Sequence, residues 1–494
     1  MSHDEVATEV PESKRRKVDQ AHLNMDCLEM IFRYLDYVAL VKLSRTCRTW
    51  NSVAGYVLQR QRKLVLMDLF VPWKKIYSLS DKHFVVIFKG KSELSELDIS
   101  VPYDSEKRSS KFLPQGLLKA VMEHCPIITK LYARDVIWDL KPALSFFAGL
   151  PHLTHLYLDY SSLTDPILDV ILANCNSLVH LDVSGTKCIT RESYKMHTAN
   201  NLTSLKADYC PEFQFGMSDI LDSISRLFPK LETLDISGYM EIGEYFEDIF
   251  RRDFIYLHGY AMSSLKMLSL KSTTGFFEDD EEMDGPVVTR TPNVETLDLN
   301  GSTLSFEFLN KLSEYCPKLT SLDMSGCEIR SQLLTSPDEN SFDGIISSLK
   351  NLEVLRFGNI YDEEDGHKDE GVPRYLRRFD LRFCVQSISI HLKQLKVLEM
   401  SDYSDLTKED VLRLILHLPQ LNEFNIQWCV DIDNHLISLL QISSNAAHPG
   451  LINRRQKLDI LVFGTSIVKG VTVPDNIPIK LHLKQKIRTY WVNN

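Results

Sequence analysis

Leu153-Thr-His-Leu156-Tyr-Leu158 and Leu178-Val-His-Leu181-Asp-Val183 are two copies of the apolar pattern that decides the fold. The same Leu-x-x-Leu-x-Leu spacing, or a close apolar variant of it, starts at residues 94, 128, 153, 178, 202, 231, 265, 294, 319, 352, 376, 395, 421 and 458. These fourteen starting points lie on average about 28 residues apart. A repeat of roughly 20 to 50 residues is typical of solenoid proteins, in which each unit stacks on its neighbours.

Each copy predicts a short strand whose leucines point inward, because side chains alternate between the two faces of a strand. Amphipathic helices are expected between the strands. One begins at Thr164, with an early proline at Pro166, and another begins at Thr407, where Asp410 completes a capping box. A helix is wider than a strand, and one repeat cannot bury its own apolar side, so the units must stack and curve. The sequence therefore predicts an α/β solenoid with parallel strands on the concave side and helices outside.

The cysteines recur at fixed positions of this pattern. One group comes just before a predicted strand: Cys125, Cys175 and Cys316. A second group follows three residues after the last apolar strand position: Cys210, Cys327, Cys384 and Cys429. These positions resemble the cysteine-containing class of leucine-rich repeats. The resemblance covers residues 92–466, about 14 repeats, and implies a fold but no particular ligand.

Residues 21–62 predict a compact helical unit in front of the solenoid. Apolar residues recur at helical spacing from Leu28 to Leu35, and Asn24 or Asp26 can cap this first helix. Asp36 can cap a second helix, and a third carries Trp50. Three helices in about 40 residues bury only a small core, so such a unit is marginally stable alone and needs a neighbour or a partner.

This unit resembles an F-box. The similarity lies in the Ile31-Phe32 pair, the leucines around it and the element Cys47-Arg48-Thr49-Trp50, although Asn24 stands where proline is usual. The resemblance implies docking on a Skp-type adaptor and, through it, on a cullin–RING ubiquitin ligase. The adaptor-binding residues expected on this basis are Leu23, Leu28, Ile31, Phe32, Leu35, Leu40, Leu43 and Trp50. The alternative is that these helices only cap the solenoid and bind no adaptor, so that their apolar residues serve only as core.

Composition argues against several classes of protein. The net charge of −11 does not favour nucleic acid as a partner. No apolar run reaches the length of a membrane helix, and the first 25 residues are too polar for a secretory signal. We find no CxxC pair, zinc-type histidine spacing, glycine-rich phosphate loop or nucleophile elbow. We therefore expect reduced, buried thiols, no metal, no cofactor and no catalytic residue, and thus a chain that is not an enzyme.

The segments that flank the repeats carry further predictions. Residues 1–20 are expected to form a disordered tail whose cluster Lys14, Arg15, Arg16 and Lys17 resembles a nuclear import signal. Residues 63–91 are predicted to be a linker or N-terminal cap, and residues 467–494 a C-terminal cap or tail. Acidic stretches at 278–284 and 362–370 predict projecting loops, which either contact a basic partner or are simply solvated.

The strand residue between the last two apolar positions should face the concave side in every repeat. Substrate-binding candidates in this column are Tyr157, Asp182, Asp235, Asp298 and Asp323. Seven of the fourteen column positions are acidic. A stripe of this kind can attract a basic partner. Alternatively, its aspartates only hydrogen-bond the strand edge, and we favour this second interpretation.

One basic island interrupts the acidic column. Arg356 lies on the strand predicted at 352, and Arg378 and Arg382 lie on the one predicted at 376. Guanidinium groups placed together can clamp a carboxylate or phosphate, so an acidic or phosphorylated substrate segment is one hypothesis. The alternative is that these arginines pair with Asp380 and Glu399 and only hold the strands in register.

The resemblances together predict the substrate-recognition subunit of an SCF-type ubiquitin ligase, located in the nucleus, the cytoplasm or both. Its F-box would dock on the adaptor, and its repeats would capture a protein that is then degraded by the proteasome. Two alternatives stay open. One is an interaction scaffold without ligase function. The other is a ligand-gated co-receptor, which would need a basic phosphate-binding pocket beneath a face that is mostly acidic.

Overall fold

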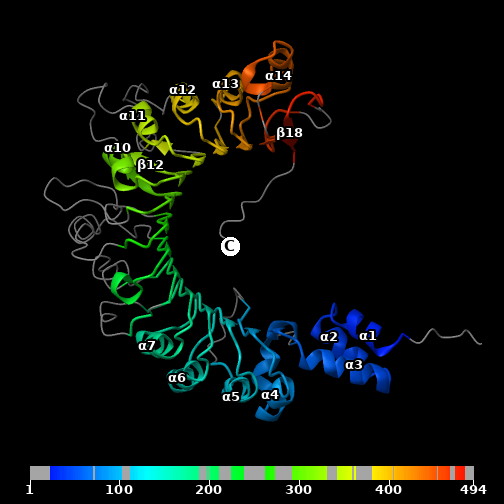
Figure 1. The fold of residues 1–494 in the computed structure, drawn as a ribbon. Helices are drawn as coiled ribbons and strands as arrows, with labels where there is room; N and C mark the ends of the chain where they lie inside the picture. The colour runs from blue at the N-terminus through cyan, green and yellow to red at the C-terminus, as the bar shows by residue number, and fades with distance from the viewer. Residues whose placement is uncertain are drawn as a thin grey trace, which may run out of the picture.

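The computed structural model describes residues 23–69, 73–102, 112–188, 197–199, 201–210, 224–238, 262–272, 292–330, 342–358, 361–362, 381–403, 405–452, 454, 456–467 and 473–483. The chain forms a curved arc with strands along its inner side and helices along its outer side (Figure 1). A small bundle of three helices stands at the N-terminal end of the arc. The predicted α/β solenoid with a helical unit in front of it is confirmed.

The N-terminal bundle consists of α1 (Met25–Phe32), α2 (Tyr37–Leu43) and α3 (Arg48–Gln59). Asn24 caps α1 by accepting a hydrogen bond from the Cys27 amide at 2.7 Å, and Asp36 caps α2 in the same way. Both predicted caps are therefore confirmed, with Asn24 rather than Asp26 at the first helix. The core is small, and its buried members are Leu28, Phe32, Leu40, Val53, Ala54 and Val57.

A short connection joins the bundle to the repeats and already belongs to the sheet. It contains β1 (Lys63–Val65), η1 (Leu66–Asp68), η2 (Trp73–Ser78) and α4 (Asp81–Phe88). Strand β1 pairs in parallel with the first predicted repeat strand, and Phe84 and Phe88 of α4 are fully buried. The segment between F-box and repeats thus forms the first turn of the solenoid.

The concave side is one parallel sheet. Its fifteen strands in the described residues are β1, β2 (Glu96–Asp98), β3 (Lys130–Tyr132), β4 (His155–Tyr157), β5 (His180–Asp182), β6 (Ser204–Lys206), β7 (Thr233–Asp235), β8 (Met267–Ser269), β9 (Thr296–Asp298), β11 (Ser321–Asp323), β13 (Val354–Arg356), β15 (Val397–Glu399), β16 (Glu423–Asn425), β17 (Leu458–Leu461) and β18 (Ile479–His482). Thirteen of the fourteen predicted strands are present. In the last predicted repeat, Leu461 rather than Val462 pairs with Asn425, so the pattern there is displaced by one residue.

Helices cover the outer side wherever the connections are described. They are α5 (Gln115–His124), α6 (Leu140–Ala148), α7 (Asp165–Asn174), α10 (Phe306–Tyr315), α11 (Phe342–Ser348), α12 (Leu381–His391), α13 (Lys408–His417), α14 (His435–Asn445) and α15 (Pro449–Ile452). The capping box predicted at α13 is present, with Thr407 and Asp410 exchanging hydrogen bonds. A second parallel sheet of β10 (Thr303–Ser305), β12 (Glu328–Arg330) and β14 (Tyr361–Asp362) follows β9, β11 and β13.

The strand predicted at 376 is wrong. Strand β13 pairs directly with β15, and residues from Leu381 onward form α12 instead. The physical reason is a competing helical period, since Cys384, Val385 and Ile388 are buried along one side of α12. The residues before Leu381 lie outside the described part of the chain.

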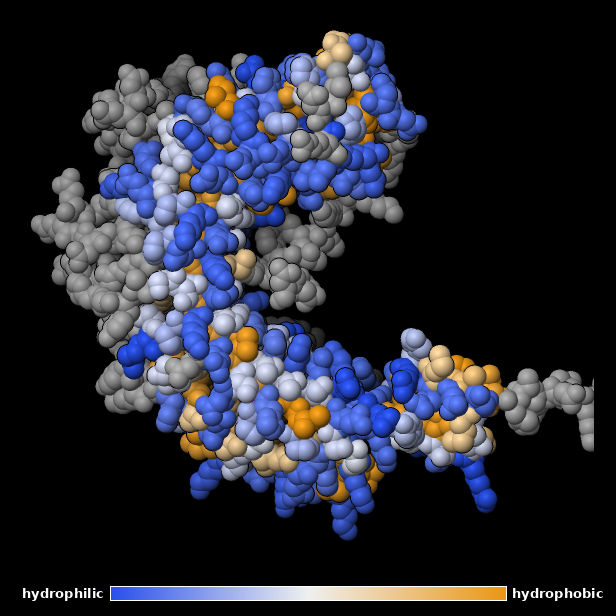
Figure 2. All heavy atoms as spheres, viewed as in Figure 1, coloured by the Kyte–Doolittle hydropathy of each residue, from blue (hydrophilic) through white to orange (hydrophobic). Residues whose placement is uncertain are grey.

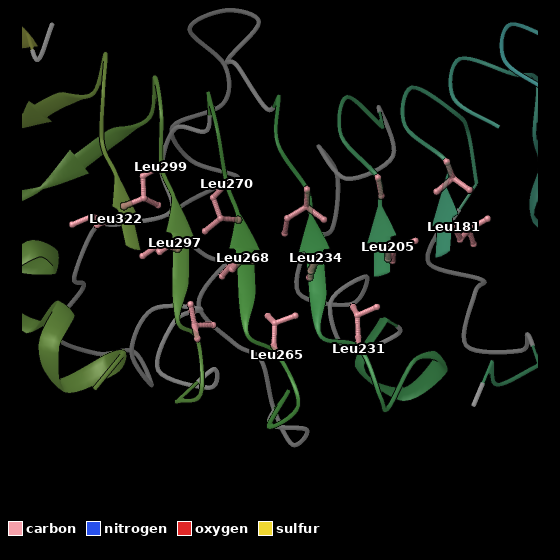
Figure 3. Close-up of a cluster of buried hydrophobic side chains, with 14 of the residues drawn as sticks. Leu181, Leu205, Leu231, Leu234, Leu265, Leu268, Leu270, Leu297, Leu299 and Leu322 are labelled. Carbon is pink, nitrogen blue, oxygen red and sulfur yellow. The ribbon is translucent and has the colours of Figure 1, made fainter. Parts of the chain in front are cut away.

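Ladders of leucines form the core between strands and helices. Leu181, Leu205, Leu234, Leu268, Leu297 and Leu322 occupy the same position in successive strands (Figure 3). These residues are at most 1% exposed. Cysteines at the repeated positions from Cys125 to Cys429 are buried free thiols, as predicted, whereas Cys27 and Cys47 in the F-box are exposed. Each repeat therefore completes its core only with the help of its neighbours.

Candidate functional site

The first helix of the bundle is apolar on two sides. Leu28 and Phe32 point inward, and the Phe32 ring meets Trp50 edge-on with centroids 5.5 Å apart. The opposite side presents exposed residues at helical spacing, namely Cys27, Met30, Ile31 and Tyr34. We call these four residues, with exposed Leu23 and Met25, the F-box apolar face. Figure 2 shows apolar residues gathered at this end of the molecule.

This arrangement divides the eight residues predicted to contact an adaptor. Leu28, Phe32 and Leu40 lie in the interior, and Leu35, Leu43 and Trp50 are partly buried around it. Leu23 and Ile31 are 54% and 46% exposed. The interior residues can therefore support docking only by holding the helices together, while Leu23 and Ile31 are free to make contact. Met30 and Tyr34 were not predicted as contact residues, because the predicted apolar face of α1 was the one that contains Leu28, Ile31, Phe32 and Leu35.

A buried lysine joins the bundle to the solenoid. Lys91 is 3% exposed and donates to the Leu58 carbonyl at 2.7 Å and to Gln61 Oε1 at 3.4 Å. Its Nζ lies 5.2 Å from the centre of the Tyr37 ring. Burial lowers the pKa of Lys91 to about 8. These contacts reach both α2 and the end of α3, so they hold the F-box in a defined position on the first turn of the solenoid.

The concave column has a clear structural role. Asp182 accepts hydrogen bonds from the Ser184 amide and hydroxyl at 3.2 and 2.7 Å, which fixes the turn that leaves β5. The same side-chain-to-amide bond occurs at Asp98–Ser100, Asp235–Ser237, Asp298–Asn300, Asp323–Ser325 and Asn425–Gln427. These bonds account for the recurrence of the acidic residue without reference to any substrate. They also hold the column in a regular row along the arc.

The middle of the column is crowded with carboxylates. Asp298 contacts Lys271 Nζ at 3.1 Å, and Glu399 lies 3.8 Å from Arg356 Nε. Burial, and secondarily the charge of Asp323, raises the pKa of Asp298 to about 6. The pKa of Glu399 is raised to about 7, again first by burial. Both carboxyl groups therefore keep their protons to a higher pH than an exposed carboxyl group does.

The N-terminal part of the column is aromatic. The rings of Tyr132 and Tyr157 stack with centroids 4.5 Å apart and almost parallel planes. The Arg134 guanidinium lies 5.6 Å from both ring centres and binds Asp159 at 3.0 Å. Burial, then the neighbouring Tyr132, raises the pKa of Tyr157 to about 12. This cluster is internally satisfied, which locates Tyr157 on the concave face as predicted but gives it structural partners of its own.

The predicted arginine cluster is not assembled. Arg356 lies on β13 in the concave column, where it faces Glu399 as the pairing alternative predicted. Arg382 was expected on a neighbouring strand, but it belongs to helix α12, and β13 pairs directly with β15. Arg378 lies outside the described residues. The hypothesis of a three-arginine clamp on adjacent strands is thus wrong.

Other predictions fall partly outside the described residues. The cluster Lys14 to Lys17 and the acidic stretches 278–284 and 363–370 lie there. Within the described ranges, no group of three or more histidine, cysteine or acidic side chains is placed to hold a metal ion. No helix in those same ranges combines the length and apolar character needed to span a bilayer.

Comparison with protein families identifies the class of this chain. The F-box domain family matches residues 21–58, which contain α1, α2 and nearly all of α3. The leucine rich repeat family matches residues 315–332, which contain β11 and β12. The chain thus carries a segment that matches the F-box domain, followed by a solenoid in which one segment matches the leucine rich repeat.

The individual proteins that match this chain share a low sequence identity with it. The F-box protein SKIP1 of Arabidopsis thaliana is 27% identical over 281 residues, a match that covers 51% of this chain and 83% of that protein. In the crystal structure of the Rad7 and Elc1 complex in yeast, a chain 15% identical aligns over 93% of both chains with a TM-score of 0.40. An internalin of Listeria monocytogenes is 15% identical over 65% of this chain and 77% of its own, with a TM-score of 0.33.

Proposed function

We propose that this protein is the substrate-recognition subunit of an SCF-type ubiquitin ligase. The F-box apolar face binds a Skp-type adaptor and thereby a cullin–RING ligase, and the concave face binds a protein substrate. The observation that carries the proposal is the exposed apolar side of α1 on a domain that matches the F-box family. Large apolar side chains that stay exposed at helical spacing typically mark a protein interface.

The mechanism is proximity rather than catalysis by this chain. Two binding surfaces on one body raise the effective concentration of substrate lysines near the charged ubiquitin carrier. Lys91 serves this mechanism because it fixes the F-box on the solenoid, so the two surfaces keep a constant separation. Degradation of the substrate by the proteasome is the proposed outcome.

The adaptor interface is tested by shortening exposed residues only. The double variant Met30→Ala/Ile31→Ala should lose co-purification of a Skp-type adaptor and cullin, since each side chain contributes roughly 1.5–3 kcal/mol when buried in an interface. The matched control is Val430→Ala/Ile442→Ala, which shortens two exposed apolar residues at the other end of the arc. Recovery of adaptor by the first variant at the wild-type level would leave the scaffold function as the remaining explanation.

Nuclear import is a separate part of the proposal. Lys14, Arg15, Arg16 and Lys17 form a basic cluster of the kind that import receptors bind. Changing all four to alanine should move a fluorescently tagged protein from the nucleus to the cytoplasm. An unchanged distribution would remove the cluster from the proposal and leave adaptor binding unaffected.

A further inference from the structure

One carboxylate of the concave column lacks a complete set of partners. Asp323 accepts a hydrogen bond from the Ser325 amide at 3.0 Å through Oδ1, while its buried Oδ2 has no hydrogen-bond partner. The Ser325 hydroxyl is likewise buried and unpaired. At the equivalent place in β5, the Ser184 hydroxyl donates to Asp182 Oδ1 and so has a partner, which the Ser325 hydroxyl lacks. A buried polar group left unpaired costs about 1–3 kcal/mol, so this exception needs a physical reason.

The side chains of Asp323 and Ser325 are both almost fully buried. Asp323 is 4% exposed and Ser325 is 3% exposed. Asp323 is the last residue of β11 and lies in the concave column, and Ser325 follows it two residues later in the turn that leaves the strand. A hydroxyl and a carboxylate oxygen together suit a donor with several N–H groups.

The charge around Asp323 favours a positive donor. Asp298 on β9 and Arg356 on β13 are its register neighbours, and beyond them Lys271 contacts Asp298 and Glu399 lies 3.8 Å from Arg356. Three carboxylates thus share two cations. Burial is the main cause of the raised pKa values of Asp298 and Glu399, and the charge of Asp323 adds to both shifts. A further cation would relieve the repulsion.

We propose, on the basis of the function proposed above, that Asp323 and Ser325 bind an arginine or lysine side chain of an extended segment of the protein substrate. The cation donates hydrogen bonds to Asp323 Oδ2 and Ser325 Oγ. Both atoms are covered in the unbound chain, so binding requires the neighbouring Arg356 side chain, which is 33% exposed, to move aside. The substrate segment recognised here is therefore basic, the opposite of the acidic segment expected from an arginine clamp.

The chain itself contains a rival occupant. Residues 484–494 include Lys484, Lys486 and Arg488 and no acidic residue. Strand β18 ends shortly before this segment and lies five strand spacings from β11, about 24 Å away. Eleven extended residues span about 36 Å, so this segment has the reach to bind at Asp323. The experiment must separate the two occupants.

The first arm measures binding of a fluorescein-labelled (Gly-Arg)4 peptide to the full chain, by fluorescence anisotropy. Asp323→Asn should raise the Kd at least ten-fold, and Ser325→Ala several-fold. Asparagine keeps the acceptor for the Ser325 amide, so an unchanged Tm verifies the fold. The matched control is Asp98→Asn, which alters the same column position and turn bond in β2 and should change the Kd less than two-fold.

Several results would overturn the cation site. Equal Kd values for wild type and Asp323→Asn would show that the peptide binds elsewhere. The same loss in Asp98→Asn would show that only net charge matters, as would equal binding of a (Gly-Glu)4 peptide. Deletion of residues 484–494 should leave the Kd unchanged. A ten-fold gain in affinity would identify that segment as the occupant and refute a substrate cation.

Failure of the receptor function has a different signature. Adaptor co-purification measured on the same samples should be identical for wild type and Asp323→Asn, because β11 is remote from the F-box along the arc (Figure 1). Absence of adaptor from all samples, with the peptide result intact, would refute the ligase role and leave the cation site standing. Normal adaptor binding with no effect of Asp323→Asn would do the reverse.

Discussion

Neighbouring residues Ile31 and Phe32 should respond to alanine in opposite ways. Phe32 is 2% exposed, packs on Trp50 and belongs to a core of only six buried residues. Phe32→Ala removes a fully buried aromatic ring, and such changes cost about 3–5 kcal/mol. A three-helix unit of this size has little stability to spare, so the F-box should unfold locally. Ile31 is 46% exposed, and its truncation should change the stability of the bundle by about 0.5 kcal/mol or less.

Amide hydrogen exchange followed by mass spectrometry tests this difference. In Phe32→Ala, the amides of α1 to α3 should lose protection, while those of the solenoid strands keep theirs. In Ile31→Ala, protection should stay at the wild-type level although adaptor binding weakens. Full protection of the bundle in Phe32→Ala, together with lost adaptor binding, would refute the assignment of Phe32 to the core and return it to the interface.

Two further predictions concern the solenoid. Gly185→Ala should destabilise it by about 1–3 kcal/mol, because Gly185 has φ +65° and a Cβ there would lie 2.5 Å from the Tyr160 ring. The control is Gly55→Ala in α3, where a Cβ would meet nothing within 4 Å. This variant should be neutral or mildly stabilising. Thermal melts of both variants check this, and equal Tm losses would contradict it. Stability of the solenoid should fall as the pH rises from about 4 to about 7, because Asp298 and Glu399 have folded pKa values of about 6 and 7, above their unfolded values, and the folded state therefore binds more protons in that window. The effect should be on the order of 1–3 kcal/mol and smaller in Asp323→Asn; a stability that rises over this window would contradict the assignment.

The strands were predictable because their leucines carry two kinds of information at once. In Leu231-Glu-Thr-Leu234-Asp-Ile236, alternation marks the strand and the repeat marks its neighbours, so each copy supports the others. The stretch from Leu376 shows a similar spacing, but β13 pairs directly with β15, and the described residues from Leu381 onward form a helix that buries Cys384, Val385 and Ile388. A pattern of six residues cannot decide between the two periods by itself.

The site was less predictable, because burial is a property of the assembled fold. Periodicity identified α1 as amphipathic, yet it could not tell which of two apolar sides would meet α3. Lys91 had no signal in the sequence, since a lysine becomes a junction residue only when carbonyl and ring partners surround it. The unpaired Ser325 hydroxyl also emerges only by comparison with Ser184 in the folded chain.

The pairing register of the sheet does not depend on the length of the connections between its strands. Twenty-one residues separate Asp182 from β6, and forty separate Arg356 from β15, yet both pairs of strands keep the same residue-to-residue register. Insertions and deletions in these connections can therefore accumulate during evolution without displacing the concave column. Two recognition surfaces can then diversify separately, one by point substitutions on the strands and one by changes in length outside them. For the protein engineer, the long connection between β13 and β15 is a place to test the insertion of an epitope or reporter outside helix α12.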